Sequence, residues 1–246
     1  MLPPPLPHQI GVLEGVLDRV AAASQQGGGP CVVFGLDGVL CDPRPRTARI
    51  LGELAEAWAP EVPELADALA RLGPAQVRYH LSHTLRQVGI SATARVRDAT
   101  RFWQDRFFSD AYCGWDEAMP GAVEFVRACH EAGARVVYLT TRDAPGMLLG
   151  TVASLRDLGF PVAVPGVELV LKPHGTMSDE AFHHGFLPGL HRAGEVAAFF
   201  DNAPAACNFV RARHPGAEVV LLETFPVPGP PDAADGVQLA ADLRMA

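Results

Sequence analysis

The stretch Cys31-Val-Val-Phe-Gly35-Leu-Asp37-Gly38-Val39-Leu40 joins a short apolar run to an acid and a glycine. A run of this length, rich in β-branched residues, predicts a strand that is buried on both faces, as in a parallel sheet. The Asp-Gly step that follows predicts a turn, because glycine adopts a positive φ at little cost. The fold can therefore be argued outward from a buried strand that ends beside an acid.

Four similar apolar runs follow, at residues 135–139, 167–171, 195–200 and 217–222. Helical patterns separate them. Val123, Val126 and Cys129 share one helix face, and a second face is expected to hold Leu148, Val152, Leu155 and Leu158. Strands that alternate with helices predict an α/β fold, a Rossmann-like parallel sheet flanked by helices. Residues 8–23 are amphipathic and predict a helix docked on this core.

The alternation breaks after the first strand, where only helical patterns occur. We therefore expect residues 1–45 and 120–246 to form the α/β core and residues 46–119 to form an inserted α-helical domain. The insert ends in an aromatic group, whose members are interpreted mainly as helical core, with one or two facing a substrate as the alternative: Phe102, Trp103, Phe107, Phe108, Tyr112 and Trp115. Residues 225–236 are rich in Pro, Gly and Asp and predict a loop.

Polar residues stand where four of the predicted strands end. They are Asp37, then Thr140 and Thr141, then Lys172, then Asp201 and Asn202. Ligands of open α/β sheets bind outside the carboxyl ends of the strands, so these side chains are expected to converge on one crevice. A lysine and a hydroxyl can hold a phosphate, and carboxylates are the ligands that Mg²⁺ prefers.

The order of these strand ends resembles the haloacid dehalogenase superfamily. Its first motif, a hydrophobic strand followed by DxD, is similar to residues 32–40. Its later motifs are similar to the strands that end at Thr140, at Lys172 and at Asp201. The resemblance covers residues 31–222, and the helical insert matches the position of the family's cap domain.

The resemblance implies a Mg²⁺-dependent phosphomonoester phosphatase acting on a small phosphorylated molecule. It implies that Asp37 is the general acid and base, and that Thr140, Thr141 and Lys172 bind the phosphoryl group. Asp201 and the backbone carbonyl of Asp37 would hold Mg²⁺. Asn202 would orient a metal-bound water.

The sequence departs from the family at its nucleophile, because Gly35 stands where the attacking aspartate is expected. Glycine supplies neither a nucleophile nor a metal ligand, so the covalent route should be lost. Two interpretations follow: an impaired phosphatase that uses an activated water, or an inactive relative that binds a phosphorylated ligand or partner. A register with Asp37 as nucleophile would need an acid at Val39. A dinucleotide-binding module is disfavoured, because no GxGxxG follows the first strand.

Three arginines are further candidates for contact with the substrate. Arg44 and Arg46 lie where the linker to the insert should pass the site, and they either recognise an anion or belong to a solvated, proline-stiffened linker. Arg142 follows the hydroxyls of the second motif.

Composition excludes several classes. The net charge of −8 disfavours nucleic-acid binding. The amphipathic first helix is too short and too charged for a membrane span. The number of cysteines, five, is odd, and no two of them have CxxC spacing. We therefore expect them to be reduced thiols. With no basic, apolar leader at the first residues, we expect a cytoplasmic protein. The sequence gives no indication of oligomeric state.

Overall fold

The computed structural model describes residues 4–225 and 229–245, and its centre is a six-stranded sheet in the order β5-β4-β1-β6-β7-β8. All neighbouring strands in this sheet are parallel. The strands are β1 (Pro30–Gly35), β4 (Arg135–Asp143), β5 (Val167–Lys172), β6 (Glu195–Asp201), β7 (Glu218–Leu222) and β8 (Val237–Ala240). The predicted α/β fold with a Rossmann-like parallel sheet is confirmed.

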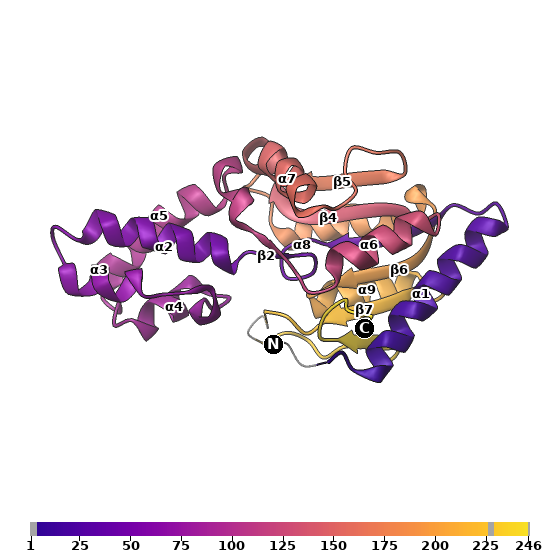
Figure 1. Ribbon diagram of the computed structural model, residues 1–246, viewed down its shortest axis with the longest axis horizontal. Helices are drawn as coiled ribbons and strands as arrows, with labels where there is room; N and C mark the ends of the chain where they lie inside the picture. Colours follow the sequence, from indigo (N-terminus) through magenta and orange to yellow (C-terminus); the bar gives the residue numbers. More distant parts are fainter. Residues whose placement is uncertain (1–3, 226–228, 246) are drawn as a thin grey trace.

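Helices cover both faces of this sheet (Figure 1). They are α1 (Pro7–Gln25), α6 (Ala122–Glu131), α7 (Ala144–Leu158), α8 (Asp179–Phe186) and α9 (Pro204–Arg213), with the 3₁₀ segment η3 (Leu187–Ala193). Strand β1 is buried along its whole length, and its side chains alternate between the two faces. Val32 and Phe34 join the core under α1 and α6, whereas Cys31 and Val33 join the core under α8 and α9. This burial on both faces explains the continuous apolar run.

A helical lobe follows β1 and lies beside the sheet, away from α1 (Figure 1). It contains α2 (Arg44–Trp58), α3 (Pro63–Ala70), η1 (Pro74–Gln76), α4 (Leu81–Gln87), α5 (Thr93–Phe107) and η2 (Asp110–Trp115). Its apolar residues form a cluster of their own, with Leu51, Leu54 and Leu85 fully or almost fully buried. The lobe therefore has its own small core.

A short antiparallel ribbon joins the lobe to the sheet. The chain enters the lobe through β2 (Cys41–Asp42) and returns through β3 (Glu117–Ala118). Cys41 lies opposite Ala118, and Asp42 lies opposite Glu117. The two linkers therefore run side by side at the carboxyl edge of the sheet.

Some local predictions are wrong or incomplete. The buried face of α7 holds Met147, Thr151 and Leu155, whereas Leu148 is exposed, because η2 packs against this side of the helix. Strand β8 was missed. The segment before it, from residue 229 to 236, forms no helix or strand, and residues 226–228 lie outside the described part. All five cysteines are buried and free, as predicted.

Candidate functional site

The predicted strand-end residues lie at the carboxyl edge of the sheet, next to the helical lobe. Gly35 ends β1, Lys172 ends β5 and Asp201 ends β6, and all three positions are buried. Strand β4 continues through Thr140 and Thr141 to Asp143. The parallel topology therefore brings these positions to one edge, although their side chains have different partners.

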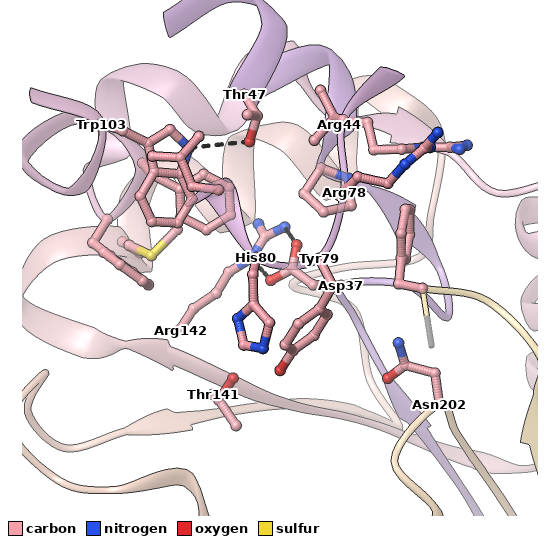
Figure 2. Close-up of a pocket in the computed structure, with 17 residues that line it drawn as sticks. Asp37, Arg44, Thr47, Arg78, Tyr79, His80, Trp103, Thr141, Arg142 and Asn202 are labelled. Atoms are coloured by element: carbon pink, nitrogen blue, oxygen red, sulfur yellow. Dashed lines mark hydrogen bonds and ion pairs between the residues drawn. The ribbon is translucent and has the colours of Figure 1, made fainter. Parts of the chain in front are cut away.

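Asp37 lies in the turn after β1, and two arginines hold its carboxylate. Arg142 donates from Nε to Oδ2 at 2.9 Å and from Nη2 to Oδ1 at 2.6 Å. Arg46, which is fully buried in the first turn of α2, donates from Nη2 to Oδ1 at 3.0 Å. Both oxygens of the expected general acid and base are thus engaged by cations of the protein itself, and Figure 2 shows the pairing with Arg142.

A second acid, Asp116, completes this cluster. It lies between η2 and β3 and accepts from Arg46 Nε at 2.8 Å and from Arg142 Nη2 at 2.6 Å. Arg46 also donates to the carbonyl of Phe107 at 3.0 Å. Two acids and two arginines therefore form a neutral buried network. Such a network repays the cost of removing charges from water only when its hydrogen bonds are well satisfied, as they are in this cluster.

The network shifts the pKa of its members in different directions. Burial raises the pKa of Asp37, but Arg142 and Arg46 outweigh it and lower the pKa from 3.8 to about 2. Burial raises the pKa of Asp116 more than the arginines lower it. Burial would lower the pKa of Arg142, but Asp37 and Asp116 raise it well above its ordinary value. Asp37 is therefore ionised at any ordinary pH, and Arg142 is permanently charged.

Gly35 leaves little room for a side chain. A Cβ at this position would lie 3.0 Å from Oδ2 of Asp201 and 3.0 Å from Cγ2 of Val39. Asp201 itself accepts from the backbone N–H of Ala203 at 2.8 Å, and burial raises its pKa, partly opposed by His183. A side chain at residue 35 would therefore require Asp201 and Val39 to shift slightly, although Gly35 also lines a hollow of about 410 Å³.

The side chains near Gly35 provide few donors for a magnesium ion. Asp201 is the one carboxylate that faces Gly35, and the carboxylate of Asp37 is committed to its arginines. Within residues 4–225 and 229–245, no group of three or more His, Cys, Asp or Glu side chains is placed to hold a metal ion. Mg²⁺ is usually held by one or two carboxylates and several waters, so the Asp201 carboxylate and the Asp37 backbone carbonyl remain the ligands predicted for it.

The predicted phosphate-binding residues have different hydrogen-bond partners in this structure. Thr140 is buried, and its hydroxyl accepts from the backbone N–H of Arg142 at 3.2 Å. Lys172 Nζ donates to Asp179 at 2.8 Å and to the carbonyl of Met177 at 3.1 Å. A hollow of about 410 Å³ lies at Thr140, Thr141 and Asp201, but Lys172 does not line it.

A second pocket of about 420 Å³ lies between the sheet edge and the helical lobe (Figure 2). It is lined by Asp37, Arg142, Thr141, Asn202 and Phe225 from the core side and by Arg44, Thr47, Arg78, Tyr79, His80, Trp103, Phe107 and Phe108 from the lobe side, among others. The glycine at position 38, with φ of 81°, lets the amide of Asn202 approach the turn that carries Asp37.

The candidate arginines have different roles in this arrangement. Arg46 is neither solvated nor free for a substrate, because all of its partners are protein groups. Arg142 lines the pocket but is held by Asp37 and Asp116. Arg44 lines the pocket and is paired with Asp42 at 2.7 Å. The solvated-linker interpretation is therefore wrong for Arg46.

Two residues of this region were missed in the sequence. Asp116 follows a tryptophan and precedes Glu117, and nothing in that local pattern distinguishes it from a surface acid. Arg78 stands in the string Arg78-Tyr79-His80, a cationic and aromatic triplet between two helical patterns. That triplet was a usable signal, because functional residues concentrate in loops. The core interpretation of the aromatic group is wrong for Phe108 and Trp115, which are about half exposed.

Comparisons with known proteins agree with this architecture. A family model described as haloacid dehalogenase-like hydrolase matches residues 30–179. A predicted phosphoglycolate phosphatase from Haemophilus somnus 129PT has a similar structure, with a TM-score of 0.50 and 14% identity, over 87% of this chain and 94% of that chain. CbbY from Rhodobacter sphaeroides in complex with phosphate has a TM-score of 0.47 and 16% identity, over 88% of this chain and 95% of that chain. No curated protein matches the sequence significantly.

In the described chain, no helix combines the length and apolar character needed to cross a membrane.

Proposed function

The chain belongs to the haloacid dehalogenase-like hydrolase family, and we propose that it binds an anionic small molecule without hydrolysing phosphate esters. One observation carries this proposal: Asp37 is held by Arg142 and Arg46, while the neighbouring nucleophile position is Gly35. The binding pocket is the one between the sheet edge and the helical lobe, where Arg44 and Arg78 are accessible.

The proposal rests first on proton chemistry. A general acid must carry a proton at the working pH, and the most effective groups have a pKa near that pH. The pKa of Asp37 is lowered to about 2 by Arg142 and Arg46, so at neutral pH this group has no proton to give to a leaving alcohol. Its lone pairs are also engaged, which weakens it as a base. Asp37 therefore serves as the hub of a buried network.

The competing function is a Mg²⁺-dependent phosphomonoesterase in which a water replaces the missing aspartate. Family membership favours it. Against it stand the single acid at Asp201, the close contact that a side chain at residue 35 would make, and the engagement of Lys172 by Asp179. Removing one essential residue of a catalytic unit typically lowers turnover by many orders of magnitude. Here the nucleophile is absent and the expected acid is engaged by two arginines.

We also propose that residues 46–119 act as a cap over the pocket, with residues 1–45 and 120–246 as the core. The separate apolar cluster of the lobe supports this division, as does the pairing of its two linkers. The cap contributes the loop of residues 77–80 and the end of α5 to the pocket wall. Ligand choice then depends chiefly on cap residues.

The test is a phosphatase assay with p-nitrophenyl phosphate, with and without Mg²⁺. We expect no turnover above that of buffer. Asp37→Asn is the matched variant, because it removes the only acid that could act at this turn while preserving its shape. Turnover by the unmodified chain that disappears in Asp37→Asn would overturn the proposal. Turnover that persists unchanged in Asp37→Asn would identify a contaminating activity.

A further inference from the structure

The pocket between the sheet edge and the lobe has two chemically different sides. Trp103 lies on one side, and Arg44 and Arg78 lie together on the opposite side (Figure 2). Its volume, about 420 Å³, is in the range of small-molecule sites. The pocket can therefore accommodate a ligand whose apolar part and charged part are separated.

The aromatic side has surface that the protein does not cover. Trp103 and Phe107 stack at 4.4 Å between ring centroids, and Arg46 lies over the Phe107 ring at 4.1 Å. Phe108 and Tyr79 are 48% and 53% exposed, and both line the pocket. Exposed aromatic rings in a concave site are the groups that bind flat apolar ligands by stacking or edge contacts.

The charges on the opposite side leave one cation without an acidic partner. Arg142 is balanced by Asp37 and Asp116, and Arg44 is balanced by Asp42. Arg78 donates from Nη1 to the carbonyl of Ala75 at 3.2 Å and from Nε to the side-chain amide oxygen of Gln87 at 3.0 Å, and both acceptors are neutral. Among the described residues, no carboxylate lies within ion-pair distance of Arg78. One guanidinium is thus available for an anion.

The neighbouring hollow at Thr140 and Asp201 does not offer a second anion site. Its lining includes four acids, which are Asp37, Asp179, Glu180 and Asp201. It includes neither arginine nor lysine. Two histidines, His183 and His184, are its cationic candidates, and Lys172 is turned toward Asp179. A phosphate dianion in this hollow would face like charges, which costs free energy in a partly buried site.

From this distribution we infer that the pocket takes an aromatic monoanion, such as an aryl carboxylate, with its charge on Arg78 and its ring against Trp103 and Phe108. The inference rests on the proposed binding function and specifies its ligand. A guanidinium binds a carboxylate through two parallel hydrogen bonds, which fixes the orientation of the attached ring.

The test is isothermal titration calorimetry with four probes: 2-naphthoate, 2-naphthol, inorganic phosphate and 2-naphthyl phosphate. We expect 2-naphthoate to bind at least tenfold more tightly than 2-naphthol or inorganic phosphate. Arg78→Gln should weaken 2-naphthoate about tenfold or more, because it removes a charge-assisted pair. Arg101→Gln is its control, since Arg101 is an exposed lobe arginine that does not line the pocket.

A second pair of variants tests the aromatic side. Phe108→Leu should weaken 2-naphthoate roughly threefold to tenfold through the loss of ring contacts. Trp115→Leu should leave the affinity unchanged, because Trp115 is 49% exposed but does not line the pocket. Both residues are accessible, so neither change is expected to prevent folding.

The outcomes separate the two proposals. Equal affinity for 2-naphthoate and 2-naphthol, tighter binding of inorganic phosphate, or an Arg78→Gln variant with unchanged affinity would each overturn the assignment of an aromatic monoanion. Release of fluorescent 2-naphthol from 2-naphthyl phosphate would instead overturn the non-hydrolytic function, whatever the affinity for 2-naphthoate. Absence of 2-naphthoate binding with no hydrolysis would overturn only the ligand assignment.

Discussion

Arg142 donates two hydrogen bonds to the carboxylate of Asp37, from Nε at 2.9 Å and from Nη2 at 2.6 Å, although the two residues are 105 positions apart in the sequence. The same guanidinium reaches Asp116, and Arg46 bridges the same two acids from the other side. The network therefore ties the turn after β1, the end of β4 and both linkers of the lobe to one point. The position that the family pattern assigns to proton transfer therefore lies at the centre of an ion-pair network.

Removing the hub should destabilise the protein. In Asp37→Ala, two buried arginines would share only Asp116, and we expect the free energy of unfolding to fall by roughly 2–3 kcal/mol. Urea unfolding at pH 7 would measure this as a lower midpoint with an unchanged slope. The control is Asp105→Ala, an exposed acid of α5, which should change stability little. A neutral or stabilising effect of Asp37→Ala would contradict a structural role, since it is the behaviour of a strained catalytic group.

The free energy of unfolding should also depend on pH, and the lowered pKa of Asp37 fixes the sign of that dependence. The pKa of Asp37 is about 2 in the folded protein and 3.8 in the reference state, so its ionised form favours folding. That contribution, roughly 2 kcal/mol at most, is complete above about pH 4 and is lost as the pH falls toward 2. The stability difference between the unmodified chain and Asp37→Asn should therefore be smaller at pH 3 than at pH 7. A difference that grows on acidification would refute the depressed pKa.

Restoring the family's nucleophile should not restore hydrolysis. A side chain at residue 35 would meet Asp201 and Val39 at 3.0 Å, so Gly35→Asp should destabilise the chain by about 1–3 kcal/mol. Gly35→Ala, which adds the same Cβ without a charge, should show much of this cost. Thermal unfolding checks stability, and p-nitrophenyl phosphate with Mg²⁺ checks activity. Turnover by Gly35→Asp alone would mean that the rest of the catalytic machinery is intact, contrary to our proposal.

Magnesium should have no specific effect on stability. An ion that binds only the folded state raises the melting temperature, and the stabilisation grows with the logarithm of its concentration once that exceeds the dissociation constant. Because the carboxylates of Asp37 and Asp116 are committed to arginines, we expect the melting temperature in millimolar Mg²⁺ to match that in EDTA with the ionic strength held constant. Ca²⁺ at the same concentration is the control for weak surface binding. A rise of several degrees with Mg²⁺ but not with Ca²⁺ would show that the folded protein binds Mg²⁺ specifically, which would contradict this prediction.

The sequence predicts the sheet well because the burial of β1 and β6 on both faces leaves a continuous apolar signature. Strand β8 is short, lies at the edge and contains an exposed leucine, so it has no such signature. The strand-end positions could be predicted from parallel topology. The partners of Arg46 could not, because Asp116 lies 70 residues away and only the folded ribbon brings the two together.

The same limit applies to the direction of side chains at the site. Lys172 and Thr140 occupy the expected strand ends, but each engages a neighbouring group of its own chain. Whether a polar side chain faces a ligand or a neighbour depends on elements packed beside it, such as helix α8, which begins at Asp179. Periodicity carries no information about that choice.

The β2–β3 ribbon brings the two ends of the helical lobe together. Since Asp42 lies opposite Glu117, a two-residue Asn-Gly turn could close the gap and bypass the lobe. That deletion would take away Arg46 and Asp116 together, one charge of each sign, and would leave Asp37 paired with Arg142. The core would then retain a balanced site. The deletion would also remove Arg44 and leave the buried carboxylate of Asp42 without its partner, so a replacement for the lobe would have to supply a cation at this position.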